Sequence, residues 1–104
     1  MRIALCNVNN LVNKINIVHT FIIDNNIDIF GVTETWLRGS VPDVIINLDS
    51  FNVYRKDTSG STAKHGVCMY VRKEFICEEI DIACDNLLCI RLVQYNVYLI
   101  CPVL

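Results

Sequence analysis

Residues 2–33, RIALCNVNNLVNKINIVHTFIIDNNIDIFGVT, decide the fold of this chain. Arg2–Asn7 contains a continuous apolar run that predicts a short buried strand, and Ile27–Thr33, rich in β-branched residues, predicts a second strand. Between them the apolar residues recur at the spacing of a helix, at Leu11, Ile15, Val18 and Ile22. This helix is expected to begin after Asn9-Asn10, either of which can cap it, and to stop at Asn25-Asn26. Strand, helix and strand together span about thirty residues, the size of a βαβ crossover, so we expect the two strands to be parallel.

The remainder of the chain predicts loops and antiparallel strands. Leu37–Ser50 contains glycine, proline, serine and aspartate and is typical of a surface loop. A short strand is expected at Phe51–Arg55 and a polar turn at Asp57–Thr62. An antiparallel meander is then expected from the runs Gly66–Val71, Phe75–Ile82, Leu87–Gln94 and Tyr95–Ile100. Strands with one helix place the chain in the α+β class.

Composition narrows the class of protein. With 104 residues, 53% of them hydrophobic and 19% charged, the chain is expected to form one domain at most, and it is not a disordered tail. A net charge of −2 argues against binding to nucleic acid by bulk positive charge, although an enzyme can still engage it locally. The sequence shows no uninterrupted apolar stretch of membrane-spanning length and no signal peptide, so we expect no membrane partner.

The six cysteines do not have the pattern of a disulfide framework or of a zinc site. Four of them lie within apolar runs, where a thiol usually serves as a small buried hydrophobe: Cys6, Cys68, Cys89 and Cys101. The sequence contains no CxxC pair, and neither histidine has zinc-site spacing from a cysteine. We therefore expect buried free thiols and a reducing intracellular compartment, the cytoplasm or the nucleus.

Two polar residues follow the predicted parallel strands. Asn7 ends the first strand and Glu34 follows the second. Because the carboxyl ends of parallel strands meet at one edge of a sheet, we expect an amide and a carboxylate side by side there. Oxygen ligands of this kind suit Mg²⁺ bound together with a substrate phosphate. The alternative is structural: Asn7 caps the helix region, and Glu34 is a solvated strand end.

Four blocks, in order, carry a resemblance to a known family: residues 5–14, 27–37, 51–57 and 64–71. The most specific parts are Thr33–Leu37 (Thr-Glu-Thr-Trp-Leu), Tyr54–Asp57 (Tyr-Arg-Lys-Asp) and Gly66–Val71 (Gly-Val-Cys-Met-Tyr-Val). This series resembles the endonuclease/exonuclease/phosphatase superfamily, and most closely the apurinic-type endonuclease domain of non-LTR (LINE-like) retrotransposons.

The resemblance implies a fold. Residues 1–104 would form the N-terminal portion of a four-layer α/β sandwich, a βαβ unit followed by antiparallel strands, with the C-terminal half of the domain absent. We expect the chain to supply one helix and most of one sheet. An apolar face would then be exposed where the partner sheet is missing.

The resemblance also implies site residues. Asn7 matches a catalytic asparagine that orders the metal and the scissile phosphate, and Glu34 matches a ligand of Mg²⁺ or Mn²⁺. Arg55 and Lys56 are candidates for contacts with substrate phosphates, or they begin a solvated loop. The implied partners are DNA, the remainder of the endonuclease domain and a reverse transcriptase in the full-length polyprotein.

Other interpretations stay open from the sequence. Trp36 either packs beneath the site or contacts substrate, while His65 is expected in a turn and His19 in a structural role. The later family motifs Tyr-x-Pro, Gly-Asp-x-Asn and Ser-Asp-His are not found, so we expect the fragment to be inactive. The chain could also derive from a phosphoinositide phosphatase, sphingomyelinase or deadenylase branch, or be a decayed, non-catalytic remnant or interaction module.

Overall fold

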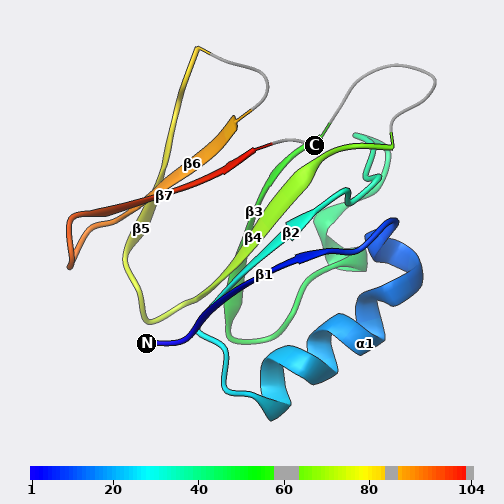
Figure 1. Cartoon of the computed structure of the whole chain (residues 1–104), viewed down its shortest axis with the longest axis horizontal. Coiled ribbons are helices and arrows are strands. Elements are labelled where there is room, and N and C mark those ends of the chain that lie inside the picture. Colours follow the sequence, from blue (N-terminus) through cyan, green and yellow to red (C-terminus); the bar gives the residue numbers. More distant parts are fainter. Residues whose placement is uncertain (58–63, 84–86, 103–104) are drawn as a thin grey trace.

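The computed structural model describes residues 1–57, 64–83 and 87–102. Within them the elements follow the order β1 (Ile3–Asn7), α1 (Leu11–Asp24), β2 (Ile29–Thr33), the 3₁₀ turn η1 (Asp43–Ile45), β3 (Phe51–Lys56), β4 (Val67–Arg72), β5 (Cys77–Ile80), β6 (Leu87–Leu92) and β7 (Val97–Pro102). Four strands form a first sheet in the order β1-β2-β4-β3, and three form a second in the order β5-β6-β7. Helix α1, the first sheet and the second sheet lie as successive layers (Figure 1). This arrangement confirms the α+β class.

The βαβ unit forms in the order and direction that the sequence predicts. The expectation that its first strand is buried is wrong, because β1 is an edge strand and is exposed along most of its length. Strands β1 and β2 are parallel, in a register that runs from Ile3 opposite Ile29 to Asn7 opposite Thr33. The Asn10 side chain caps α1 by accepting a hydrogen bond from the Asn13 N–H at 3.3 Å. At the other end the Asn25 N–H donates to the Phe21 carbonyl, where the helix stops. The local pattern therefore sets both the limits of this helix and the direction of the strands beside it.

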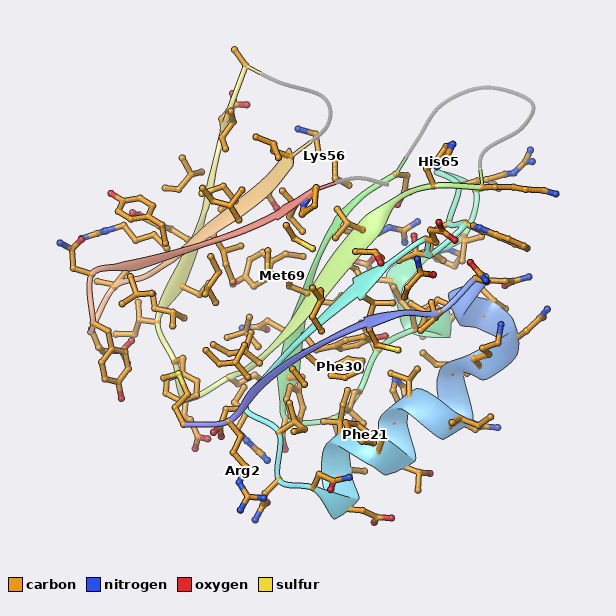
Figure 2. The ribbon with its side chains drawn as sticks, in the orientation of Figure 1. Arg2, Phe21, Phe30, Lys56, His65 and Met69 are labelled. Atoms are coloured by element: carbon orange, nitrogen blue, oxygen red, sulfur yellow. The ribbon has the colours of Figure 1, made fainter. Side chains whose placement is uncertain are left out.

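Two apolar cores separate the three layers. The stripe on α1 buries Leu11, Val18 and Ile22 against the first sheet, with Ile15 partly buried beside them. Between the sheets, the buried side chains are Ile29, Val67, Met69 and Val71 from the first and Leu88, Ile90, Leu92 and Cys101 from the second. Figure 2 shows Phe30 directed toward the helix layer and Met69 toward the second sheet. The first sheet is thus covered on both faces, which explains why β2 is buried along its whole length.

The predicted single meander is wrong in one respect. Strand β4 lies in the first sheet between β2 and β3, whereas β5, β6 and β7 form the second sheet as a meander of their own. Residues on both faces of β4 are buried, as in a central strand. The expectation that the chain supplies most of one sheet and lacks its partner is also wrong, because β5–β7 cover the first sheet.

The segment 37–50 is not simply a surface loop. Leu37 and Ile46 are fully buried in the core beneath α1. The Tyr70 hydroxyl donates a hydrogen bond of 2.6 Å to the Ile46 carbonyl, and the His19 ring meets the same oxygen at 3.3 Å. Leu37 and Ile46 therefore anchor this segment to the core. Its turn-forming composition had predicted a surface loop without such buried residues.

The cysteines divide by position. Cys68, Cys89 and Cys101 are buried free thiols, as expected, and Cys77 is half-buried. Cys6 is exposed, so the expectation of a buried thiol is wrong there, because β1 is an edge strand. Burial raises the pKa of Cys68 and Cys101, which keeps these thiols protonated. Over the described ranges, no helix is long and apolar enough to cross a bilayer.

His19 makes the stability of the fold depend on pH. Because a carbonyl can only accept, Nε2 carries the proton and donates to Ile46, and burial lowers the pKa of this imidazole. The unfolded chain therefore binds a proton more readily than the folded one, so stability is full above the usual imidazole pKa of about 6.5 and falls below it.

We expect the free energy of unfolding to fall between about pH 7 and pH 5, and His19→Gln to flatten that slope. Urea unfolding at several pH values measures both. The pKa of Asp28 is also lowered, chiefly by the Arg2 N–H, but its contribution is lost only at more acidic pH. An equally steep slope in the variant would assign the pH dependence to another group.

Candidate metal and phosphate site

The candidate residues gather at one edge of the first sheet. The carboxyl ends of β1 and β2 meet there, since Asn7 lies opposite Thr33 and Glu34 follows directly. The same end of the sheet carries the start of β4 and the end of β3, because Val67 pairs with both Thr33 and Lys56. Figure 2 shows Lys56 and His65 at this end, with Arg2 at the opposite one. We call this edge the rim.

The backbone at Glu34 is held in an unusual conformation. Glu34 and Trp36 have φ values of 53° and 56°, in the left-handed region that costs a non-glycine residue about 1–3 kcal/mol. Three hydrogen bonds hold this segment from two sides: Asn10 N–H to Glu34 O at 3.1 Å, Thr35 N–H to Gly66 O at 3.2 Å and Trp36 N–H to His65 O at 2.9 Å. The helix start and the β4 start together therefore fix the direction in which the Glu34 side chain leaves the chain.

Thr35 and Gly66 form the centre of this clamp, and sequence reasoning assigned neither a role. Thr35 is fully buried, and its carbonyl accepts the Leu11 N–H at 2.9 Å. Gly66 has a φ of +106°, and a Cβ added there would lie 2.7 Å from the Thr35 Oγ1. The only signal in the sequence was the position of both residues inside the blocks that carry the family resemblance.

Gly66→Ala is expected to destabilise the protein by at least about 2 kcal/mol, because alanine at this φ is strained and its methyl group collides with Thr35. Gly39→Ala is the matched control, since nothing lies within 4 Å of a Cβ at Gly39. Urea midpoints compare the two variants. Equal midpoints would contradict a close packing of Thr35 on Gly66.

Lys14 fixes the other side of the rim. Its ammonium donates to the carbonyls of Val8 and Asn9 at 2.6 and 2.5 Å. These two residues directly follow Asn7 and lead into the helix. The loop that follows the candidate asparagine is therefore tied to the first turns of α1.

Trp36 and Lys64 add an aromatic ring and a positive charge to the rim. The Lys64 ammonium lies over the Trp36 ring, 5.4 Å from its centroid, a cation–π contact. The Trp36 indole Nε1 is buried and finds no acceptor among the described residues. His65 is exposed and lies just before β4, in a stretch without regular secondary structure.

Arg55 binds the protein itself. Its guanidinium donates to both carboxylate oxygens of Asp57, to Asp43, and to the carbonyls of Val41 and Arg38. Asp57 contributes most to raising the pKa of this guanidinium. Lys56 donates to the Leu87 carbonyl at 3.0 Å and so joins the two sheets. For both residues, contact with a substrate phosphate stays a prediction.

The donor chemistry at the rim fits a hard divalent cation held partly by substrate. Glu34 offers a carboxylate that no described residue pairs with, and Asn7 offers an amide oxygen on the neighbouring strand. In the part of the chain that the structure describes, no three histidine, cysteine or acidic side chains converge as a preformed metal cage. Mg²⁺ typically keeps several waters and binds through one or two carboxylates plus a phosphate, which matches this sparse set.

Comparison with solved structures identifies the fold. An AP endonuclease from Archaeoglobus fulgidus superposes with a TM-score of 0.70 at 22% sequence identity, over 96% of this chain and 40% of that protein. The chain has part of an AP-endonuclease-like fold. It spans less than half the length of that structural relative. No protein-family model and no curated protein matches the sequence.

The AP-endonuclease-like fold accounts for the layers described above. The expected portion of the sandwich is confirmed, since nearly all of this chain superposes on the relative. At this level of identity the likeness establishes the fold alone. The roles of Asn7, Glu34, Arg55 and Lys56 therefore rest on the geometry of the rim and on the motif resemblance.

Proposed function

We propose that this chain is the N-terminal part of a metal-dependent phosphodiesterase domain, a DNA endonuclease of the non-LTR retrotransposon type. The observation that carries the proposal is the Glu34 carboxylate, which pairs with no residue of the described ranges. It follows the strand beside the one that ends in Asn7, on a backbone clamped in a strained conformation. Strain of this kind persists where the surroundings enforce it, and it concentrates at functional sites.

The rim residues would divide the work of phosphodiester cleavage. Glu34 would hold Mg²⁺ or Mn²⁺, and the Asn7 amide would orient the scissile phosphate beside it. The bound cation would stabilise negative charge on the phosphate and on the leaving oxygen. The Thr35–Gly66 clamp would keep the carboxylate directed at one place, so that little reorganisation accompanies binding.

The proposed substrate is DNA, and the finer assignment depends on the motif resemblance. The Thr33–Leu37 and Tyr54–Asp57 blocks favour the retrotransposon branch over the phosphoinositide phosphatase, sphingomyelinase and deadenylase branches. The Lys64 ammonium over Trp36 adds a positive charge and an aromatic ring at the rim, both of which suit a nucleic acid. The remainder of the endonuclease domain and a reverse transcriptase are the proposed partners in a longer polyprotein.

Metal titration tests the assignment of Glu34. We expect weak Mn²⁺ binding by the purified chain, and Glu34→Gln to abolish it, because the amide removes the only charged ligand we assign. Paramagnetic broadening by Mn²⁺ of the NMR signals from Asn7, Glu34 and Thr35 reports the location. Glu74→Gln is the matched control, since this exposed glutamate follows the far end of β4. Equal broadening in the wild type and in Glu34→Gln would refute the metal site.

A further inference from the structure

Three positive side chains near the rim already bind groups of the protein. The Arg55 guanidinium donates to two carboxylates and two backbone carbonyls. The ammonium groups of Lys56 and Lys14 donate to backbone carbonyls. A cation engaged in this way reaches a phosphate only by giving up bonds to partly buried acceptors, which then lose their donor. These three residues are therefore poorly suited to hold a substrate phosphate at the rim.

Lys64 is held differently. Its side chain is exposed, and its ammonium lies over the Trp36 ring, 5.4 Å from the centroid. Within the described ranges, this ammonium makes no hydrogen bond to an oxygen and no ion pair. A cation–π contact holds the charge through the face of the ring and leaves the three N–H donors for other acceptors. The Lys64 ammonium is therefore kept in place and can still bind an anion.

Two backbone hydrogen bonds fix the position of Lys64 relative to the candidate metal ligand. The Thr35 N–H donates to the Gly66 carbonyl at 3.2 Å. The Trp36 N–H donates to the His65 carbonyl at 2.9 Å. The segment that begins with the candidate carboxylate and the segment that begins with Lys64 thus run side by side, and Figure 2 shows His65 at this end of the first sheet. A phosphate beside the metal ligand would therefore lie next to a lysine as well.

We propose that Lys64, held over the Trp36 ring, binds a backbone phosphate of DNA at the rim, in place of the two cations that the sequence favoured. The inference rests on the proposed function and names the side chain that would meet the phosphate next to the Glu34 metal site. An ammonium is a compact charge, and charge-assisted hydrogen bonds to phosphate oxygens are among the stronger ones in proteins. Trp36 is a positioning residue here, because it acts through Lys64.

The net charge of the chain makes the contribution of one lysine measurable. At a net charge of −2, bulk attraction to DNA is absent, so only a few local contacts set the salt dependence of binding. For duplex DNA, each phosphate contact contributes about 0.9 to the slope of log affinity against log salt concentration. The loss of one contact therefore removes a large fraction of a small slope.

Salt-dependent DNA binding tests the role of Lys64. Fluorescence anisotropy of a labelled DNA duplex measures affinity at several low salt concentrations, without divalent cations, so that the result does not depend on the metal site. We expect Lys64→Gln to weaken binding about three- to tenfold and to lower the slope by about one. Lys64→Arg should restore both, because a guanidinium also pairs with phosphate and stacks on an aromatic ring. Lys73→Gln is the matched control, since Lys73 is also exposed but follows the far end of β4.

Trp36 gives a second, spectroscopic readout, because it is the only tryptophan in the chain. We expect DNA to change the Trp36 emission in the wild type and much less in Lys64→Gln, since a phosphate bound to the ammonium alters its contact with the ring. The Lys64 side chain is exposed, so Lys64→Gln should keep the wild-type urea midpoint.

The outcomes separate Lys64 from the proposed function. If the wild type binds DNA and Lys64→Gln binds with the same affinity and slope, the role of Lys64 is overturned and DNA stays the proposed substrate. Equal losses in Lys64→Gln and Lys73→Gln would overturn it as well, because the effect would then be one of general charge. A chain that binds no DNA even at low salt would overturn both Lys64 and the DNA substrate, while the Mn²⁺ titration would still decide on Glu34.

Discussion

Arg55→Ala is expected to lower the free energy of unfolding by about 2–4 kcal/mol. The substitution leaves partly buried acceptors in the segment before β3 without their hydrogen-bond donor. The Arg55 side chain is 15% exposed and makes ion pairs of 3.0 Å with Asp43 and 2.7 Å with Asp57. It also satisfies the carbonyls of Val41 and Arg38. One guanidinium thus joins β3 to the segment that covers the helix core.

Two further variants sharpen this measurement. Arg55→Lys keeps the charge but not the planar fork, so we expect it to recover only part of the loss. Arg91→Ala removes an arginine–glutamate pair, with Glu78, at a more exposed position than Arg55, and we expect little change. If Arg55→Ala unfolds at the wild-type urea midpoint, Arg55 is free for a substrate phosphate, and its contacts in the protein are incidental.

The parts of the fold that depend on local sequence could be predicted. The stripe of Leu11, Val18 and Ile22 fixed the helix, and the length of the βαβ unit fixed the direction of β1 and β2. The sheet to which β4 belongs could not be predicted in the same way. It pairs with β3, the preceding strand, but also with β2, more than thirty residues earlier in the sequence, and strand periodicity does not say which strand becomes a neighbour.

The candidate site could likewise be predicted only in part from the sequence. Parallel strands and their polar ends sufficed to place Asn7 beside the strand that leads to Glu34. The clamp around Glu34 was missed because it depends on positive φ values at Glu34 and Trp36, residues that rarely adopt them. The contacts of Arg55 were missed for another reason: its acceptors are mostly carbonyls and carboxylates of a segment that was expected to be a surface loop.

The 104-residue chain is expected not to nick DNA at a measurable rate. At the rim, Asp57 is engaged by Arg55 at 2.7 Å, which leaves Glu34 as the unpaired carboxylate among the described rim residues. His19 cannot act as a base there, because it lies on α1 with its ring against the Ile46 carbonyl. General-base assistance alone contributes about 10²–10⁴-fold, and preorganised charge often contributes more, so one carboxylate and one amide supply little of the acceleration.

The nicking rate is measured by the relaxation of supercoiled plasmid DNA in the presence of Mg²⁺. The chain and its Glu34→Ala variant should give the same background, while an intact AP endonuclease acting on plasmid that contains abasic sites serves as the positive control. The metal titration keeps the two questions separate, since Mn²⁺ can bind at Glu34 without any cleavage. Nicking by the chain that disappears in Glu34→Ala would mean that the rim already holds a complete catalytic set. His65 and Lys64, both at the rim in the stretch just before β4, would then be the first residues to replace.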